Sequence, residues 1–563
     1  MEQYRKVIAQ AIAESSIIEQ PEAELLLEFP PDSRLGDFAF PCFTLARRLK
    51  QPPNTIAGNL ALQLEKNQLF SKVTAVGPYV NFTLSRPQLA REVLGEILAG
   101  EVEYGNSDTG QGKVVTIDFS SPNIARPFPL QLLRSTVIGA ALGKIYRSQG
   151  YRVIGINHLG DWGTQFGKLI AAFRKWGDRD KLREKPVTHL IELYVRFRQE
   201  AEKDSGLEEK GRLWFKRLEE GHAEALELWR EFRALSLEEF RRVYNLLGVE
   251  FEHFHGESFY NDKLDSVLSL LENKELLRKS QGALVVELGE EMPPCIIKKQ
   301  DGATLYATRD ISAAIYRQEQ YQFDKMLYVV GADQSLHFRQ VFAVLELMGF
   351  SWAENCVHVR FGLIRFKEGK MSTRQGKVVL LEDVLNKAVQ LSLEIIQQKN
   401  PELEQKEKVA RQVGIGAVIF ADLVTDRIKD VEFEWEKILD FSGDTAPYIQ
   451  YAHARICSIL RKEHPRHQDI RGEMYTGREE EALLIALSRF PAALSRSLEL
   501  DKPSVLARYL LDLARDFNQF YHACPVLQAE QETRDARLLL TMSVRVVLAK
   551  GLSLLGIAAP EEM

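Results

Sequence analysis

Cysteine is scarce in this sequence of 563 residues, and the way it is scattered excludes two common structural roles. The five cysteines are an odd number, lie far apart and never form a Cys-x-x-Cys pair, so we expect neither a disulfide framework nor a zinc site. Two histidine pairs, His253 with His255 and His464 with His467, match no metal-ligand spacing. We interpret them as surface or capping histidines, and the sequence predicts no metal site.

Long uninterrupted apolar runs are also missing. The N-terminal segment MEQYRKVIAQAIAES carries early charges and does not resemble a secretory signal, while the apolar stretch 538–559 is broken by Arg545 and Lys550. We therefore expect a cytoplasmic protein that does not contact a membrane. A formal net charge of −6 gives no global sign of nucleic-acid binding, but a large enzyme can confine its lysine and arginine residues to one face.

The common phosphate-binding signatures are absent as well. The sequence has no Walker A motif, no Gly-x-Gly-x-x-Gly and no internal repeat, which argues against a P-loop ATPase and an ordinary dinucleotide enzyme. Hydrophobic residues make up 45% and charged residues 27%, as in folded globular proteins. The length predicts two to four domains.

The pattern of strands and helices divides the chain into three predicted domains. Residues 1–110 mix helical and strand-like segments and end at the polar link GNSDTGQGK, which predicts a small α+β domain. Over 111–400 short buried strands alternate with helices, which indicates a parallel α/β sheet with a charged helical insertion at about 179–247. Strand signals vanish over 401–563, where amphipathic helices predict an α-helical bundle.

The most informative stretch is VVTIDFSSPNIARPFPLQLLRST, residues 114–136. A β-branched run leads into Ser-Ser-Pro-Asn and then into a helical pattern. This order of strand, loop and helix is typical of folds that place phosphate groups at a helix N-terminus. We therefore expect a nucleotide near this segment.

Motifs along the whole chain add to this stretch. They are SPNIARPFPLQLLRST (121–136), INHLGDWGTQFGKL (156–169), GESFYN (256–261), DGATLYATRDISAA (301–314), VVGADQSLHFRQVF (329–342), GKMSTRQGK (369–377) and APYIQYAHARICSILRK (446–462), preceded by GDFAFPCFTLA (36–46) and VGPYVNF (76–82). In this order they resemble the class I arginyl-tRNA synthetases. The resemblance implies a Rossmann-like catalytic domain between an additional N-terminal domain and a C-terminal anticodon-binding bundle. It also implies a monomer that activates L-arginine with ATP and Mg²⁺ and transfers it to tRNA(Arg).

Recognition of arginine needs carboxylates for the guanidinium group and polar side chains for the α-amino and α-carboxylate groups. The resemblance implies an arginine site lined by residues from several motifs. They are Asn123, Glu257, Tyr306, Asp310 and Gln334. Each has a simpler interpretation, since an aspartate can cap a helix and a tyrosine can belong to a core, but the joint pattern favours the site.

The same resemblance implies an ATP site between two segments, of which GKMSTRQGK is the family's KMSKS-type loop. The implied catalytic residues are Lys370, Ser372 and His337. The implied ATP-binding residues are Arg126, Pro129, Gln131, Leu132, His337, Lys370 and Met371. Lys370 is expected near the pyrophosphate and His337 near the nucleotide.

The second ATP segment departs from the family pattern. The family has a HIGH-type motif such as His-Val-Gly-His directly before Leu-Arg-Ser-Thr, and this sequence has Pro-Leu-Gln-Leu, residues 129–132. Gln131 puts a side chain where glycine lets adenine approach, and Leu132 cannot donate a hydrogen bond to a phosphate. Losing one such donor costs roughly a hundred- to a thousandfold in rate. We expect weakened activation; the alternatives are a paralogue that binds arginine or tRNA without efficient adenylation and, more remotely, another nucleotidyl transferase.

The tRNA-binding residues follow from the resemblance alone. In the C-terminal domain Tyr448, Tyr451 and Arg455 are implied to contact the RNA, and the aromatic run at Phe517, Phe520 and Tyr521 offers stacking surfaces. Aromatic residues at helical spacing are more often core, so we expect at least half of these to be buried. In the N-terminal domain, Asn81 and Phe82 are the residues expected to contact the D-loop.

Overall fold

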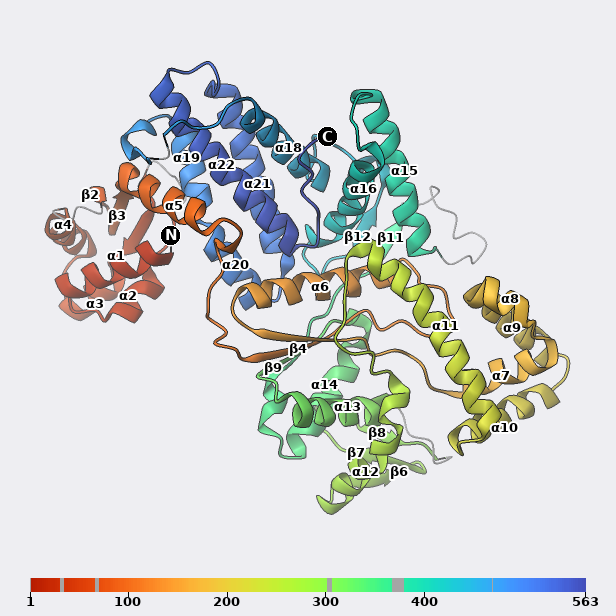
Figure 1. Ribbon diagram of the computed structural model, residues 1–563. Helices are drawn as coiled ribbons and strands as arrows, with labels where there is room; N and C mark the ends of the chain where they lie inside the picture. Colours follow the sequence, from red (N-terminus) through yellow and green to blue (C-terminus); the bar gives the residue numbers. More distant parts are fainter. Residues whose placement is uncertain (1, 31–34, 66–69, 301–305, 367–378, 468) are drawn as a thin grey trace.

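The computed structural model describes residues 2–30, 35–65, 70–300, 306–366, 379–467 and 469–563 (Figure 1). A parallel sheet lies at the centre, with an α+β unit at one end of the chain and a helical bundle at the other. This confirms the predicted fold class. Among the described helices none is long and apolar enough to cross a bilayer.

The N-terminal unit is a three-stranded antiparallel sheet with helices around it, in the order β1-β3-β2. Its elements are α1 (Glu2–Ser15), α2 (Gln20–Leu26), β1 (Phe38–Pro41), α3 (Phe43–Leu49), α4 (Pro53–Leu64), β2 (Phe70–Val76), β3 (Tyr79–Leu84) and α5 (Arg86–Gly100). At the junction of β3 and α5, Arg86 pairs with Asp37 at 2.6 Å and with Glu481 of the C-terminal bundle at 3.4 Å. The start of helix α5 therefore connects the N-terminal unit to the C-terminal bundle.

The central sheet has the strand order β10-β9-β4-β5 and is parallel throughout. Its strands are β4 (Val114–Asp118), β5 (Arg152–Ile156), β9 (Lys325–Tyr328) and β10 (Cys356–His358), and its helices are α6 (Leu132–Ser148), α13 (Tyr306–Tyr321) and α14 (Ser335–Leu347). From β4 the chain first adds β5 on one side and then returns to add β9 and β10 on the other side, so the strand order reverses between β4 and β9. In sheets of this kind, ligands bind in the crevice at that reversal, beyond the carboxyl ends of the strands.

Helix α6 packs very closely on the sheet. A Cβ atom at Gly139 would lie 2.3 Å from the Phe119 ring, so only glycine allows this approach. The helix is buried along most of its length and ends beside the helical bundle, where the Tyr146 hydroxyl donates a 2.6 Å hydrogen bond to Asp501. In its first turns Arg134 forms a fully buried ion pair of 2.7 Å with Asp422.

Two insertions interrupt the central sheet between β5 and β9. The first is helical and comprises α7 (Thr164–Trp176), α8 (Arg179–Glu184), α9 (Pro186–Ala201), α10 (Gly206–Glu219) and α11 (Ala223–Leu247). The second was not predicted and consists of the 3-10 helix η3 (Glu257–Lys263), α12 (Leu264–Asn273) and an antiparallel sheet of β6 (Leu277–Ser280), β7 (Ala283–Val286) and β8 (Cys295–Lys298).

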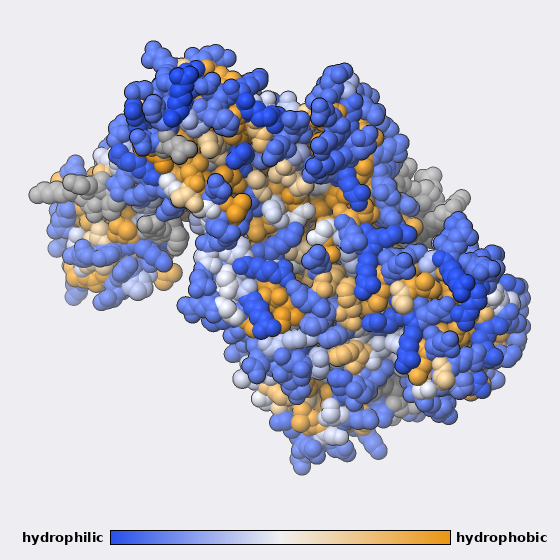
Figure 2. Space-filling model, in the orientation of Figure 1, coloured by the Kyte–Doolittle hydropathy of each residue, from blue (hydrophilic) through white to orange (hydrophobic). Residues whose placement is uncertain are grey.

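The last part of the chain is almost entirely helical. Its elements are α15 (Leu381–Lys399), α16 (Lys406–Leu423), α17 (Trp435–Ile438), α18 (Ala446–Lys462), α19 (Arg478–Ser488), α20 (Phe490–Glu499), α21 (Pro503–Ala523) and α22 (Gln531–Leu554). One expectation was wrong in detail, because a short strand β12 (Val431–Phe433) pairs in parallel with β11 (Ile364–Phe366). Hydrophilic residues cover most of the face in Figure 2, and hydrophobic residues gather in its middle.

Candidate active site

The loop after β4 lies at the reversal of the sheet and is held in an unusual backbone conformation. Ser120, Ser121 and Ala125 have φ angles of 71°, 52° and 57°, which are left-handed and cost side-chain-bearing residues about 1–3 kcal/mol each. The Ser135 hydroxyl compensates by accepting a 2.8 Å hydrogen bond from the Ser120 N–H and donating one of 2.6 Å to the Val329 carbonyl. The loop is thereby fixed to α6 and to the end of β9.

Asn123 lies in this loop, where it pairs with the segment that follows β5. The Ile124 N–H donates to the Gly160 carbonyl, and the Gly160 N–H donates to the Pro122 carbonyl, both at 3.1 Å. A Cβ atom at residue 160 would come within 1.9 Å of the Asn123 Oδ1 atom. The exposed Asn123 side chain is therefore placed by close backbone contact with Gly160.

Asp310 on α13 is held by a histidine of the neighbouring helix. The His337 Nε2 atom on α14 lies 2.6 Å from Asp310 Oδ2, and the His158 Nε2 atom lies 3.9 Å from Asp310 Oδ1. The Asp310 side chain is about one-fifth exposed, at 21%. His337 is held against this predicted arginine-binding carboxylate, and its expected contact with the nucleotide stays a prediction.

Glu257 begins η3, and its backbone N–H donates a 2.9 Å hydrogen bond to the Leu159 carbonyl, next to His158. Burial raises the pKa of Glu257 to about 7, against an opposing effect of Arg309 and with a further contribution from Asp310. Asp161, which also raises this pKa, is fully buried and accepts a hydrogen bond of 2.8 Å from the Ser258 N–H. The Asp310 charge thus acts on Glu257, and a cation bound near these two acidic groups would stabilise their ionised forms.

The other two predicted arginine-binding residues lie at the ends of the helices that carry the site. Tyr306 is the first residue of α13 and is 66% exposed, and Gln334 is an exposed residue of the 3-10 helix η4 (Ala332–Gln334) just before α14. Within the described part of the chain, neither side chain is hydrogen-bonded to Asp310. Their place in the fold allows a role in the site, but that role stays a prediction.

The predicted ATP segment forms a backbone connection that the sequence did not suggest. The Leu130 N–H donates a 2.9 Å hydrogen bond to the Val379 carbonyl, and the Leu381 N–H donates one of 3.0 Å to the Phe128 carbonyl. Pro129 is the residue paired with Leu380 in this short antiparallel bridge. Lys370, Met371 and Ser372 belong to 367–378, outside the described residues.

A tight turn precedes α6 and uses its first backbone donors. Gln131 precedes the helix with an exposed side chain that makes no capping hydrogen bond, and partly buried Leu132 is the first helical residue. The Leu132 N–H donates a 3.1 Å hydrogen bond to the Pro129 carbonyl and the Leu133 N–H one of 2.9 Å to the Leu130 carbonyl, so the attraction that this end of α6 exerts on an anion is that of the helix dipole. Arg126 is nearby in the loop, exposed, and donates a 3.2 Å hydrogen bond to Gln165.

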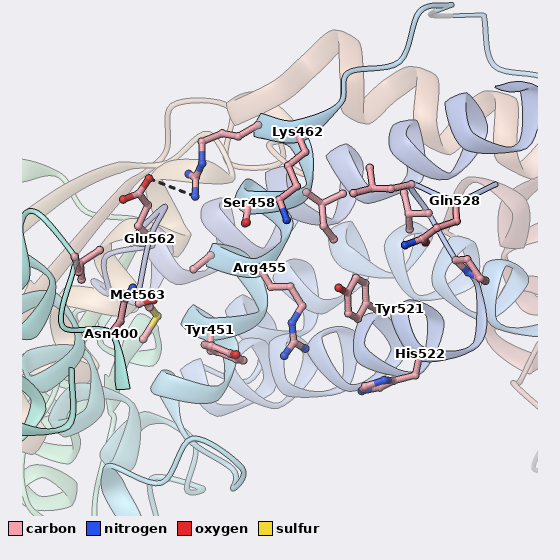
Figure 3. Close-up of a pocket in the computed structure, with 17 residues that line it drawn as sticks. Asn400, Tyr451, Arg455, Ser458, Lys462, Tyr521, His522, Gln528, Glu562 and Met563 are labelled. Carbon is pink, nitrogen blue, oxygen red and sulfur yellow. Dashed lines mark hydrogen bonds and ion pairs between the residues drawn. The ribbon is translucent and has the colours of Figure 1, made fainter. Parts of the chain in front are cut away.

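Apart from this site, a pocket with a volume of about 690 Å³ lies among the C-terminal helices (Figure 3). The Arg455 guanidinium lies 4.7 Å from the ring centre of Tyr451 and 5.2 Å from that of Tyr521. It also donates a 2.8 Å hydrogen bond to Asn518, whose amide in turn donates to the Tyr448 hydroxyl. Both tyrosine rings beside the arginine are partly exposed. Sequence reasoning missed the remaining polar lining, which includes Asn400, Ser458, Lys462, His522 and Gln528.

Aromatic residues of the predicted RNA-binding regions divide into core and surface. Phe517 and Phe520 are fully buried, as expected for part of the aromatic run. Asn81 and Phe82 are also buried, at 3% and 0% exposure, because they point to opposite faces of the central strand β3 and both faces are covered there. As they stand, neither side chain reaches a surface that an RNA could contact.

The exposed aromatic residues nearby were missed. The Phe43 ring is 48% exposed and lies 5.8 Å from the Tyr79 ring in an edge-to-face contact. Within the residues that the structure describes, no group of three or more His, Cys, Asp or Glu side chains could hold a metal ion.

Family models match the chain in three successive parts. The model of the arginyl tRNA synthetase N terminal domain matches residues 2–84, that of the catalytic domain of tRNA synthetases class I (R) matches residues 93–435, and that of the DALR anticodon binding domain matches residues 449–563.

Curated relatives and solved structures are similar over nearly their full length. The arginine–tRNA ligase of Clostridioides difficile (strain 630) is 48% identical over 566 residues, covering 100% of both chains. Arginine–tRNA ligase 2 of Bacillus anthracis is 50% identical over 539 residues, covering 96% of this chain and 95% of the relative. The arginyl-tRNA synthetase structure from Thermus thermophilus has a TM-score of 0.83 at 28% identity, covering 99% of this chain and 100% of the other.

Proposed function

The chain belongs to the class I arginyl-tRNA synthetases, and from this membership we propose how its own residues carry out the reaction. The enzyme joins L-arginine to tRNA(Arg) at the expense of ATP. An arginine carboxylate oxygen attacks the α-phosphorus and pyrophosphate leaves; a terminal ribose hydroxyl of the tRNA then attacks the carbonyl and AMP leaves. The relatives support this activity over the impaired alternative.

The observation that carries the assignment of roles is the pair of acidic groups at Asp310 and Glu257. A guanidinium group stays charged at all physiological pH values and forms two parallel hydrogen bonds to a carboxylate. Asp310, fixed by His337 at 2.6 Å, accepts the substrate guanidinium. Glu257 supplies a second acidic group, and the arriving positive charge lowers its raised pKa so that it ionises.

The opposite end of the substrate lies toward the loop after β4. Asn123 projects from this loop beside Gly160, and its amide can hydrogen-bond the α-amino or α-carboxylate group. Tyr306 and Gln334, at the starts of the two helices that carry Asp310 and His337, bind the substrate backbone or its aliphatic part. These roles orient the reacting carboxylate toward the first turn of α6.

ATP binds with its phosphates at that first turn. The positive end of the α6 dipole attracts negative charge, and Arg126 adds a positive charge. Lys370, Met371 and Ser372 lie outside the described residues; with His337 they are the residues expected to bind the nucleotide. Mg²⁺ would neutralise charge on the triphosphate and would be bound mainly by phosphate oxygens.

The tRNA contacts both ends of the molecule. Unstacked anticodon bases enter the 690 Å³ pocket, where Tyr451 and Tyr521 flank the Arg455 guanidinium and Tyr448 supports it through Asn518. At the N-terminal unit the exposed ring of Phe43 and the partly buried ring of Tyr79, rather than the buried side chains of Asn81 and Phe82, face the D-loop. The enzyme works in the cytoplasm as a monomer.

The test is exchange of labelled pyrophosphate into ATP, with and without tRNA(Arg), followed by aminoacylation. We expect arginine-dependent exchange that citrulline, the uncharged analogue, does not support. Asp310→Asn keeps the size of the side chain and should abolish exchange at arginine concentrations that saturate the wild type. Exchange that is equally fast in Asp310→Asn would contradict the assigned guanidinium site.

A further inference from the structure

A buried ion pair lies directly beneath the carboxylate that accepts the guanidinium. Arg317 Nη2 is 2.8 Å from Asp118 Oδ2, and the two side chains are 1% and 7% exposed. Arg317 follows Asp310 by seven residues on α13, so both project from the same face of that helix. Asp118, the last residue of β4, also accepts a 3.1 Å hydrogen bond from the Ser121 hydroxyl. The pair thus connects the substrate helix to the strained loop.

His158 stands between this ion pair and Asp310. Its Nδ1 atom is 3.4 Å from Arg317 Nη2, and its Nε2 atom is 3.9 Å from Asp310 Oδ1. The ring is 15% exposed and its centre lies 5.6 Å from that of Tyr260, a fully buried residue of the 3-10 helix η3 that begins with Glu257. One imidazole therefore contacts the elements that carry both acidic groups of the site.

The chemistry of arginine decides which nitrogen of His158 bears the proton. A guanidinium group can only donate hydrogen bonds, so His158 Nδ1 must accept. In the neutral ring the hydrogen then resides on Nε2, which faces Asp310. On the other side His337 Nε2 donates to the second oxygen of Asp310, which can only accept when ionised. His337 Nε2 therefore holds Oδ2 by a hydrogen bond, whereas the His158 Nε2–H faces Oδ1 from 3.9 Å, beyond hydrogen-bond distance, and acts on it electrostatically.

We propose that His158 and Arg317 are positioning residues for arginine recognition: Arg317 selects the tautomer of His158, and His158 sets the orientation of the Asp310 carboxylate. This inference rests on the proposed role of Asp310 as the guanidinium acceptor. Neither residue touches the substrate in this arrangement. Their effect is to hold the Asp310 carboxylate in the orientation that accepts two hydrogen bonds from a planar guanidinium group. The Asp310 side chain then loses less conformational freedom when arginine binds.

A matched pair of substitutions separates the two sides of the imidazole. His158→Asn retains a polar atom near the place of Nδ1 but removes the donor toward Asp310, and His158→Gln retains an amide near the place of Nε2. An N–H group that faces a carboxylate from 3.9 Å interacts with it more weakly than a hydrogen bond does, so we expect His158→Asn to raise the KM for arginine severalfold. The KM for ATP should change less than about twofold, and His158→Gln should restore most of the arginine KM.

A purely structural role would give a different result. Equal losses in the KM for arginine and for ATP, or an unchanged arginine KM in His158→Asn, would overturn the proposal. Arg317→Lys keeps the positive charge beside Asp118 but shortens the reach to His158. We expect it to raise the arginine KM in the same direction as His158→Asn, and melting curves identify any variant that does not fold.

Two measurements do not depend on turnover and keep this proposal distinct from the proposed function. In ¹⁵N-histidine spectra of the full-length protein, His158 should show the Nε2–H tautomer; the Nδ1–H tautomer would refute the argument. Calorimetry should show weaker arginine binding to His158→Asn than to His158→Gln, even if the wild type failed to exchange pyrophosphate. Equal binding to the two variants would exclude positioning by His158.

Discussion

The backbone N–H of Leu130 donates a 2.9 Å hydrogen bond to the carbonyl oxygen of Val379. Leu130 belongs to the Pro-Leu-Gln-Leu segment, which stands where the family resemblance implies a HIGH-type motif, and Val379 lies just before α15. Two parts of the chain about 250 residues apart in sequence are therefore joined at this point. A displacement of the Pro-Leu-Gln-Leu segment acts through these hydrogen bonds on the N-terminus of α15.

The altered segment can be tested by restoring the family pattern. In the double variant Gln131→Gly with Leu132→His, the glycine opens the approach for adenine and the imidazole supplies a donor at the first helical position. Because one donor to a developing phosphate charge is worth roughly a hundred- to a thousandfold in rate, we expect kcat for pyrophosphate exchange to rise by about that factor. Gln131→Gly with Leu132→Phe is the control without a donor. If both variants match the wild type, the site does not use these positions.

Glu257 predicts a pH dependence of arginine binding. Its pKa is raised from the ordinary value of 4.5 to about 7, chiefly by burial. Substrate guanidinium binds the ionised form, so the KM for arginine should fall as pH rises from about 6 to 8 and then level off. Glu257→Gln should bind arginine more weakly above pH 7 and lose this dependence. A wild-type profile that is flat over the same range contradicts the assignment.

The same group predicts a trend in stability. A carboxyl group whose pKa is raised in the folded state binds more protons there than in the unfolded chain between pH 4.5 and about 7. The free energy of unfolding therefore falls as pH rises through this interval, relative to Glu257→Gln. Urea unfolding of both proteins at pH 5 and pH 8 measures the difference.

Gly160 predicts a steric effect on substrate orientation. A methyl group at residue 160 would meet the Asn123 Oδ1 atom at 1.9 Å, so Gly160→Ala must displace that side chain or its loop. We expect a severalfold or larger increase in the arginine KM. The double variant Gly160→Ala with Asn123→Ala removes the clashing amide and should regain the thermal stability lost in the single variant, without regaining the KM. Unchanged kinetics in Gly160→Ala would exclude Asn123 from the site.

Arg455 predicts a change in tRNA affinity and in its salt dependence. Arg455→Gln removes the charge held between Tyr451 and Tyr521. Filter binding should show a severalfold weaker Kd for tRNA(Arg), and the slope of log affinity against log salt should decrease by about one. The matched control is Arg496→Gln, whose guanidinium pairs with Glu499 on an exposed face of α20. Equal effects of the two substitutions would contradict a specific role for this pocket.

The strands of the central sheet were predictable because their sequences are short, buried and rich in β-branched residues. The runs Val114–Ile117 and Val153–Ile156 became β4 and β5, and the segments at 326 and 357 became β9 and β10. Strands β6–β8 escaped prediction since they have only four residues each: β6 (Leu-Arg-Lys-Ser) is largely polar, and β7 (Ala-Leu-Val-Val) and β8 (Cys-Ile-Ile-Lys) are apolar runs too short to show a period. At three residues, β12 is too short for any periodicity to appear.

The site was predictable in its parts and less so in its contacts. The motifs imply that Asp310 and Glu257 belong to one site, and the geometry places His337 against Asp310. The contact of His337 with Asp310 depends on how α13 and α14 pack, which no local pattern specifies. Burial of Asn81 and Phe82 depends likewise on tertiary packing, because these neighbours point to opposite faces of β3 and both faces are covered there.

Helix α6 has a mechanical consequence for the molecule. Its 17 residues extend about 25 Å, from the phosphate segment at Leu132 to Tyr146 near the opposite end. Near the two ends of α6, Tyr146 is hydrogen-bonded to Asp501 and Arg134 is paired with Asp422. Lys325 of β9 also binds Asp501. The helix is therefore attached to the C-terminal helices at both of its ends (Figure 1). The bundle cannot swing against the sheet without moving this helix or breaking those bonds. A tilt of the bundle would therefore be transmitted along α6 to the segment that we propose binds the phosphates of ATP.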